Sequence, residues 1–208
     1  MVKVWGGVLT GVVALAISVM AFAGEPEKKP TLTPVTVAVT GFHCQACPDG
    51  LQKDLAKLEG ATEVKATLKP AQVTASLDEA KITVSQFVNA IAAHPTAMDQ
   101  KKTYGATLQA FIDTPMCAKQ ETMCQACFTE IPKALTALKG IHAVTLDKTG
   151  KIASLRFDAD AKVTTSTIAE TLAKHKFKFT VAFTVPAIAE KPKASTGHSA
   201  HGSHGGHH

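Results

Sequence analysis

The sequence predicts an α+β protein made of two βαββαβ modules in tandem. The chain repeats itself, because a shift of 80 residues places Cys44-Gln-Ala-Cys47 on Cys124-Gln-Ala-Cys127. Within each copy the apolar residues alternate as in strands or recur with a helical period. Only eleven of the 208 residues are Phe, Tyr or Trp. That is little aromatic volume for one large core, so we expect small modules packed with Ala, Val, Leu and Ile.

The first 23 residues have the pattern of a secretory signal peptide. Lys3 supplies a positive charge, residues 4–22 are apolar, and Ala21-Phe22-Ala23 fits the small-residue cleavage pattern. An uncleaved membrane anchor is the alternative, because the apolar stretch approaches the ~20 residues that span a bilayer. Polar residues follow at once, so we expect cleavage after Ala23 and a periplasmic or secreted protein. Residues 24–34, rich in Pro and Lys, are interpreted as a linker.

Residues 35–102 are expected to form the first module. Alternation over 35–39 predicts a strand, and a helical period after Cys47 stops at Gly60. The later elements are a hairpin around Lys69-Pro70-Ala71, a helix opened by the capping box Thr83-Val-Ser-Gln86, and a short strand after Pro95.

Residues 104–185 repeat this order in the second module. Its expected elements are a strand at 108–112, a helix marked by Phe128, Ile131, Leu135 and Leu138, a hairpin turning at 147–150, a helix at 164–174 and a strand at 177–183. Pro132 should remove a hydrogen bond from the first of these helices or delay its start. The order βαββαβ is the split-βαβ, ferredoxin-like motif.

The two Cys-x-x-Cys pairs are the strongest chemical signal in the chain. Each pair follows a first strand and precedes a helix, where the helix dipole favours a thiolate. Two thiolates at this spacing can approach one soft ion from both sides, as copper(I), mercury(II) or zinc require.

The segment Thr40-Gly41-Phe42-His43-Cys44-Gln45-Ala46-Cys47-Pro48 resembles the Gly-Met-Thr-Cys-x-x-Cys signature of heavy-metal-associated domains. Pro48 and the exported setting look most like the periplasmic mercury-binding proteins of mercury-resistance systems. The similarity covers residues 35–102 well and 104–185 more weakly. It implies a βαββαβ fold and soft or borderline metal ions bound by Cys44 and Cys47, and by Cys124 and Cys127. It also implies delivery to a membrane metal transporter or another metal-binding protein.

Both copies depart from this signature. Phe42 and His43 stand at the Met and Thr positions of the first copy, and Glu121 and Thr122 replace Gly and Met in the second. About seven extra residues precede the second motif, so its cysteines are expected to be held differently.

Three further residues could enlarge the sites. Cys117, seven residues before Cys124, is either a third thiolate or an odd cysteine with an intermolecular disulfide partner. His94 and His175 end the second helix of each copy. The resemblance places the loop after that helix beside the cysteines, which would allow a Cys₂His site. The alternative is a solvated His at a helix C-terminus. His43 and His142 are interpreted as surface residues.

Residues 186–208 are a His-rich, low-complexity tail that is expected to be disordered. Imidazoles spaced by Gly and Ser can bind borderline ions such as nickel or zinc at several sites, and an affinity tag or spacer is the alternative. The candidate ligands are His198, His201, His204, His207 and His208.

Several function classes are excluded by composition and motifs. The net charge of +5 is spread along the chain without a dense Lys/Arg block, so no nucleic-acid partner is expected. Phosphate-binding loops, dinucleotide fingerprints and nucleophile elbows are absent from the sequence, so neither an organic cofactor nor catalysis is expected. The preferred hypothesis is an extracytoplasmic carrier or scavenger of soft metal ions. A thiol–disulfide exchange protein and a scaffold with oxidised cysteine pairs are the alternatives.

Overall fold

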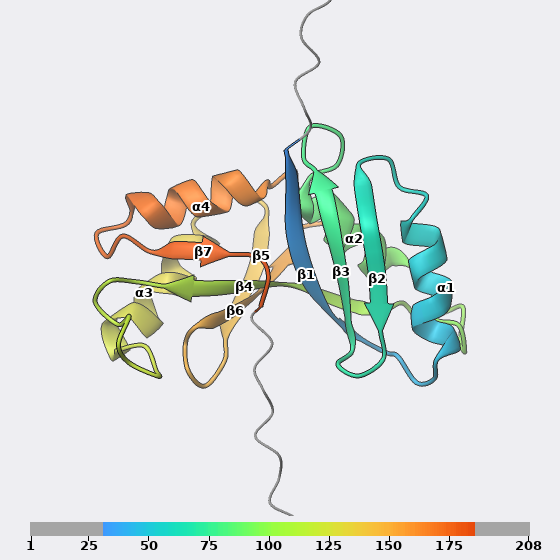
Figure 1. Cartoon of the computed structure of the whole chain (residues 1–208), viewed down its shortest axis with the longest axis horizontal. Helices are drawn as coiled ribbons and strands as arrows, with labels where there is room; N and C mark the ends of the chain where they lie inside the picture. Colours follow the sequence, from blue (N-terminus) through green and yellow to red (C-terminus); the bar gives the residue numbers. More distant parts are fainter. Residues whose placement is uncertain (1–30, 186–208) are drawn as a thin grey trace, which may run out of the picture.

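Seven antiparallel strands and four helices make up residues 31–185, the part of the chain that the computed structural model describes (Figure 1). This arrangement confirms the predicted α+β class and is consistent with the ferredoxin-like folds of heavy-metal-associated domains. The expected signal peptide 1–23 and the tail 186–208 lie outside the described residues. Within residues 31–185, the helices are all too short or too polar to cross a membrane.

The first half follows the predicted order. Its elements are β1 (Leu32–Thr40), α1 (Ala46–Leu55), β2 (Ala61–Thr67), β3 (Gln72–Asp78) and α2 (Val84–Ala93). The capping box is present, because the Thr83 side chain accepts from the Gln86 backbone and the Gln86 side chain accepts from the Thr83 backbone. The expected linker is too long by three residues, since Leu32 to Pro34 already pair with β3.

The second half repeats these elements with one difference from the expectation, in its last strand. Its elements are β4 (Gly105–Asp113), α3 (Gln125–Thr136), β5 (Ile141–Leu146), β6 (Ile152–Phe157), α4 (Thr165–Lys174) and β7 (Thr180–Ala182). Pro132 lies inside α3, so the first of its two predicted effects, the loss of a helix hydrogen bond, is confirmed, and the start of the helix is not delayed. The last strand is shorter than the predicted 177–183, because only three of its residues pair with β4.

One strand, β4, belongs to both halves of the sheet. The strand order is β2-β3-β1-β4-β6-β5, with β7 also on β4. The first half therefore has the order β2-β3-β1-β4, and the second half has the equivalent order β5-β6-β4-β7. Strand β4 is the last strand of the first half and the first strand of the second half. Figure 1 shows β4 running from the α1 side across to the α3 side.

This sharing corrects the expected boundary between the modules. The separate strand predicted after Pro95 is reduced to a single bridge between Pro95 and Thr103. Residues 105–109 of β4 pair with β1 in its place, while residues 108–111 pair with β6. Because a strand has two hydrogen-bonding edges, one strand can complete two sheets.

Hydrogen bonds from α2 and the turn before it also join the halves. The buried Ser85 hydroxyl donates to the Ala161 carbonyl at 2.8 Å and accepts from the Val163 N–H at 2.8 Å. The Glu79 carboxylate accepts from the N–H and hydroxyl of Thr165, at the start of α4. The two cysteine motifs therefore stand on one continuous framework.

Candidate metal centres

The first cysteine pair lies where the β1–α1 loop enters α1. The Sγ atoms of Cys44 and Cys47 are 3.8 Å apart, and the Cys47 N–H donates to the Cys44 carbonyl at 3.1 Å. Cys44 is exposed and Cys47 is buried. The pair can therefore hold an ion between two sulfurs while one side stays open to solvent.

Hydrogen-bond donors around Cys47 favour its thiolate. The backbone of His43 is the main cause that lowers the pKa of Cys47, and the backbone and side chain of Cys44 add to it. Burial acts in the opposite direction, and the Tyr104 side chain contributes a further lowering hydrogen bond. The backbone at the helix start thus prepares this sulfur for a metal ion, as the sequence predicted from the helix terminus.

Tyr104 is a site residue that the sequence reasoning missed. It is the only tyrosine in the chain, directly precedes β4, and is 3% exposed. Burial is the main cause that raises the pKa of its hydroxyl, so the group stays protonated and can donate to the Cys47 sulfur. The Tyr104 ring contacts Phe42 edge-on, with ring centroids 5.2 Å apart. Its isolation in the sequence, ten residues after His94, gave no signal of this role.

His94 directs both of its ring nitrogens toward oxygen atoms. Its Nε2 is 3.0 Å from the Asp54 carboxylate and its Nδ1 is 2.9 Å from the Pro95 carbonyl oxygen. Its ring stacks on Tyr104, with centroids 6.0 Å apart. Both ring nitrogens of His94 thus contact oxygen atoms, and a role for His94 as a metal ligand stays a prediction.

Replacement of Tyr104 by phenylalanine should weaken the first pair while preserving the packing of the ring. Loss of the hydroxyl removes a donor to the thiolate, so the pKa of Cys47 should rise and metal binding should begin at higher pH. Loss of an outer-shell partner typically lowers metal affinity by about 10–100-fold, and we expect the lower end of that range. Ultraviolet titration of the thiolate and competition for bound metal measure the two effects. Unchanged values would remove Tyr104 from the site.

The second pair lies at the start of α3 and is joined by a third cysteine. The Sγ atoms of Cys117, Cys124 and Cys127 all lie within 4.8 Å of one another, and those of Cys117 and Cys127 are 3.9 Å apart. Cys117 and Cys127 are buried, and Cys124 is half-buried. This is the only group of three or more His, Cys, Asp or Glu side chains within residues 31–185 whose ligand atoms converge in this way.

The acidity of these thiols differs along the group. The backbone of Cys127, followed by the side chains of Cys127 and Cys117, lowers the pKa of Cys124. Burial, followed by hydrogen bonds with Cys124 and Cys117, raises the pKa of Cys127 to about 12. Cys124 therefore ionises more readily than Cys127. It is also the most accessible of the three cysteines.

His175 has the same type of environment in the second half as His94 has in the first. Its Nε2 is 3.2 Å from the Glu130 carboxylate, and its Nδ1 accepts from the Phe177 N–H at 3.4 Å. Each repeated histidine thus pairs with a carboxylate on the first helix of its own half.

The remaining histidines were predicted as surface or tail residues. His43 and His142 are exposed, and His142 lies 3.5 Å from the Asp158 carboxylate. His198, His201, His204, His207 and His208 lie outside the described residues.

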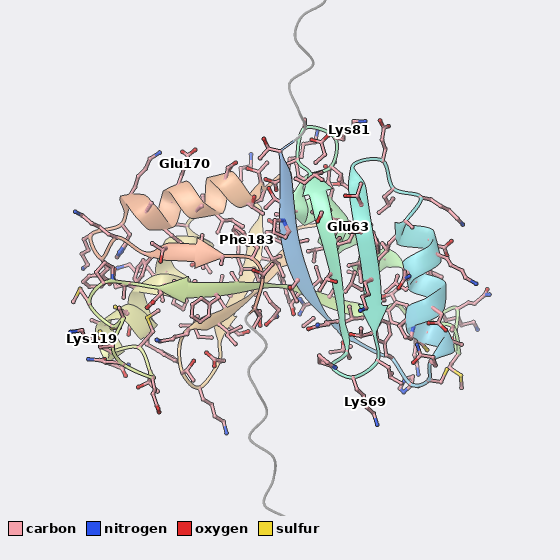
Figure 2. All side chains as sticks on the ribbon, in the orientation of Figure 1. Glu63, Lys69, Lys81, Lys119, Glu170 and Phe183 are labelled. Carbon is pink, nitrogen blue, oxygen red and sulfur yellow. The ribbon has the colours of Figure 1, made fainter. Side chains whose placement is uncertain are left out.

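The two centres lie at opposite ends of β4. Tyr104 directly precedes this strand, and the loop that contains Cys117 follows it. Nine strand residues span about 30 Å. Lys119, in that loop, is labelled at the end of the molecule opposite α1 (Figure 2). An ion on one centre is therefore too far away to contact the other directly.

Comparison with known proteins agrees with this chemistry. The family described as "Heavy-metal-associated domain" matches residues 119–178, within the half whose signature departs more from the family pattern. The mercuric transport protein periplasmic component of Pseudomonas aeruginosa is 32% identical over 68 residues, which are 32% of this chain and 75% of that protein. A copper-exporting P-type ATPase of Staphylococcus aureus is 29% identical over 135 residues, 62% of this chain and 15% of the ATPase.

Among solved structures, oxidised MerP from Ralstonia metallidurans CH34 is 34% identical over 30% of this chain and 86% of its own, with a TM-score of 0.29. On the sequence matches, the chain belongs to the heavy-metal-associated domain family.

Proposed function

We propose that this chain is an extracytoplasmic protein that carries or scavenges soft metal ions on its Cys-x-x-Cys sites and catalyses no reaction. The ions are copper(I), mercury(II) or zinc. The observation that best supports the proposal is the Cys44–Cys47 pair, with sulfurs 3.8 Å apart and a lowered pKa at Cys47. A mercury-transport component and a copper-exporting ATPase among the relatives favour the same class of ion.

Tandem heavy-metal-associated modules, the first from β1 to β4 and the second from β4 to β7, are part of this proposal. The repeated strand order and the match of residues 119–178 support it. The predicted signal peptide and the periplasmic relative support export to the periplasm or beyond. The tail histidines would add weaker sites for nickel or zinc.

Accessibility of Cys44 favours delivery to a partner. An ion held by two thiolates, with one exposed, can be attacked by the thiolate of an incoming protein. The partner would be a membrane metal transporter or another metal-binding protein.

Thiol–disulfide exchange is the weaker alternative. An attacking thiolate must be both ionised and accessible. At the first pair the thiol with the lowered pKa is Cys47, which is 1% exposed, while the accessible sulfur belongs to Cys44. The arrangement suits a ligand better than an attacking nucleophile.

Metal stoichiometry of the reduced protein tests the proposal. We expect about two tightly bound soft ions, one for each Cys pair, and loss of one ion when Cys44 and Cys47 are both changed to Ser. The measurement is copper(I) or mercury(II) titration in the presence of competing glutathione, with residues 196–208 deleted in a control to remove the tail imidazoles. A double variant that keeps both ions would refute the assignment of the first site.

A further inference from the structure

We propose that Cys117, Cys124 and Cys127 form a buried three-thiolate centre that takes a soft ion in three-coordinate form and retains it, whereas the Cys44–Cys47 pair exchanges its ion. The inference rests on the proposed metal-binding function and specifies what the second site does. Cys117 lies outside the Cys-x-x-Cys motif and comes from the loop that lengthens the second copy.

The positions of the three sulfurs suit one ion. They lie within 4.8 Å of one another, with 3.9 Å between those of Cys117 and Cys127. An ion at the centre of three sulfurs 3.9 to 4.8 Å apart lies about 2.3 to 2.8 Å from each, at or slightly above the zinc–thiolate bond length of about 2.3 Å. Binding therefore forms three metal–sulfur bonds without large movement, and the thiols release their protons to solvent with no change in oxidation state.

Hydrogen bonds hold the loop of Cys117 in this position. The Thr114 hydroxyl donates to the Phe177 carbonyl at 2.7 Å, and the Met123 N–H donates to the Thr149 carbonyl at 2.7 Å. The Cys124 N–H donates to the Cys117 sulfur at 3.4 Å. The third ligand is thus fixed from both ends of the loop before any ion arrives, which reduces the ordering required on binding.

Burial closes this centre where the first is open. Met123, which directly precedes Cys124, is 7% exposed because the turn at Gly150 packs against it. A Cβ added to Gly150 would lie only 2.9 Å from the Met123 Cβ. Cys117 and Cys127 are 1% and 0% exposed. Cys124 is the most accessible of the three cysteines but is itself half-buried, so ligand exchange should be slower than at the exposed Cys44.

The three ligands that residues 31–185 supply at this centre favour a particular type of ion. Within residues 31–185, other His, Cys, Asp and Glu side chains do not join the group, and His175 pairs with Glu130. Structural zinc prefers four protein ligands, whereas soft thiolates suit soft ions. The site therefore fits a thiophilic ion that accepts three sulfurs, and mercury(II) is a direct probe.

The test uses the full chain with Cys44→Ser and Cys47→Ser, so that the second centre is the remaining thiolate site. Reduced protein is loaded with one equivalent of mercury(II), its sulfur ligands are counted by X-ray absorption, and release to excess glutathione is timed. We expect three sulfurs and slow release. Loss of an outer-shell partner alone costs about 10–100-fold in affinity. Cys117→Ser and Cys117→Ala should therefore give two sulfurs and release at least about 100-fold faster. Met116→Ala, an exposed neighbour in the same loop, should change neither value.

Two results would overturn the inference. A count of two sulfurs with Cys117 present would show that it is not a ligand. A covalent dimer of the purified protein that disappears with Cys117→Ser would assign this cysteine to an intermolecular disulfide. In the complementary variant, Cys117, Cys124 and Cys127 are changed to Ser. If the Cys44–Cys47 pair binds mercury(II) in that variant, neither of these two results contradicts the proposed function. Failure of both centres to bind would instead refute the proposed function.

Discussion

Replacement of Leu108 by alanine should destabilise both halves of the protein together. Leu108 is fully buried on β4, where it lies opposite Val37 of β1 and Leu155 of β6. Truncation of a buried leucine typically costs about 2–5 kcal/mol. Because the affected strand completes both sheets, amide hydrogen exchange should accelerate in β3 and in β6 by the same factor.

A matched variant makes this result specific. Leu172 in α4 is equally buried but belongs only to the second half, so Leu172→Ala shows whether the halves can open separately. Leu172→Ala is allowed to accelerate amide exchange in β6 alone. Leu108→Ala must accelerate amide exchange in β3 as well. Unchanged protection of the β3 amides in Leu108→Ala would show that the halves fold independently of their shared strand.

Replacement of Ser85 by alanine should have an effect of similar size, although it removes a single oxygen atom. The Ser85 hydroxyl satisfies the Ala161 carbonyl and the Val163 N–H inside the contact between the halves. Each buried polar group left without a partner costs about 1–3 kcal/mol. The midpoint of urea unfolding should therefore fall clearly.

Ser166→Ala provides the control, because Ser166 is exposed at the start of α4. Surface substitutions of this kind usually change stability by less than about 0.5 kcal/mol. If both variants unfold at the same urea concentration, the buried hydrogen bonds between the halves do not contribute to stability.

The order of the helices and strands could be predicted from the sequence because its signals are local. Alternating valines marked β1, and Thr83 with Gln86 marked the start of α2. Gly60 and Gly140 follow the first helix of each copy with positive φ angles of 91° and 97°, where the missing side chain allows the chain to turn. The placement of each Cys-x-x-Cys at a helix start followed from the same spacing.

The roles of the third cysteine and of the tyrosine depended on contacts between distant segments. The sequence left Cys117 open between a ligand and a disulfide partner, since a loop of that length permits contact without requiring it. The anchoring of the loop on Phe177 and Thr149 brings its sulfur to Cys127. Tyr104 reaches Cys47 only because the chain returns past the first motif to enter β4.

The chain's own residue spacing thus determined the repeat, the elements and the position of both cysteine pairs. Only the tertiary structure decided that β4 serves both halves, that the Tyr104 side chain contributes to the lowered pKa of Cys47, and that Cys117 joins the second pair. The physical reason is that hydrophobic periodicity and helix caps act between neighbours in sequence. Strand edges and loop ends instead find partners across the fold, where hydrogen bonding and burial choose among arrangements that the sequence pattern allows equally.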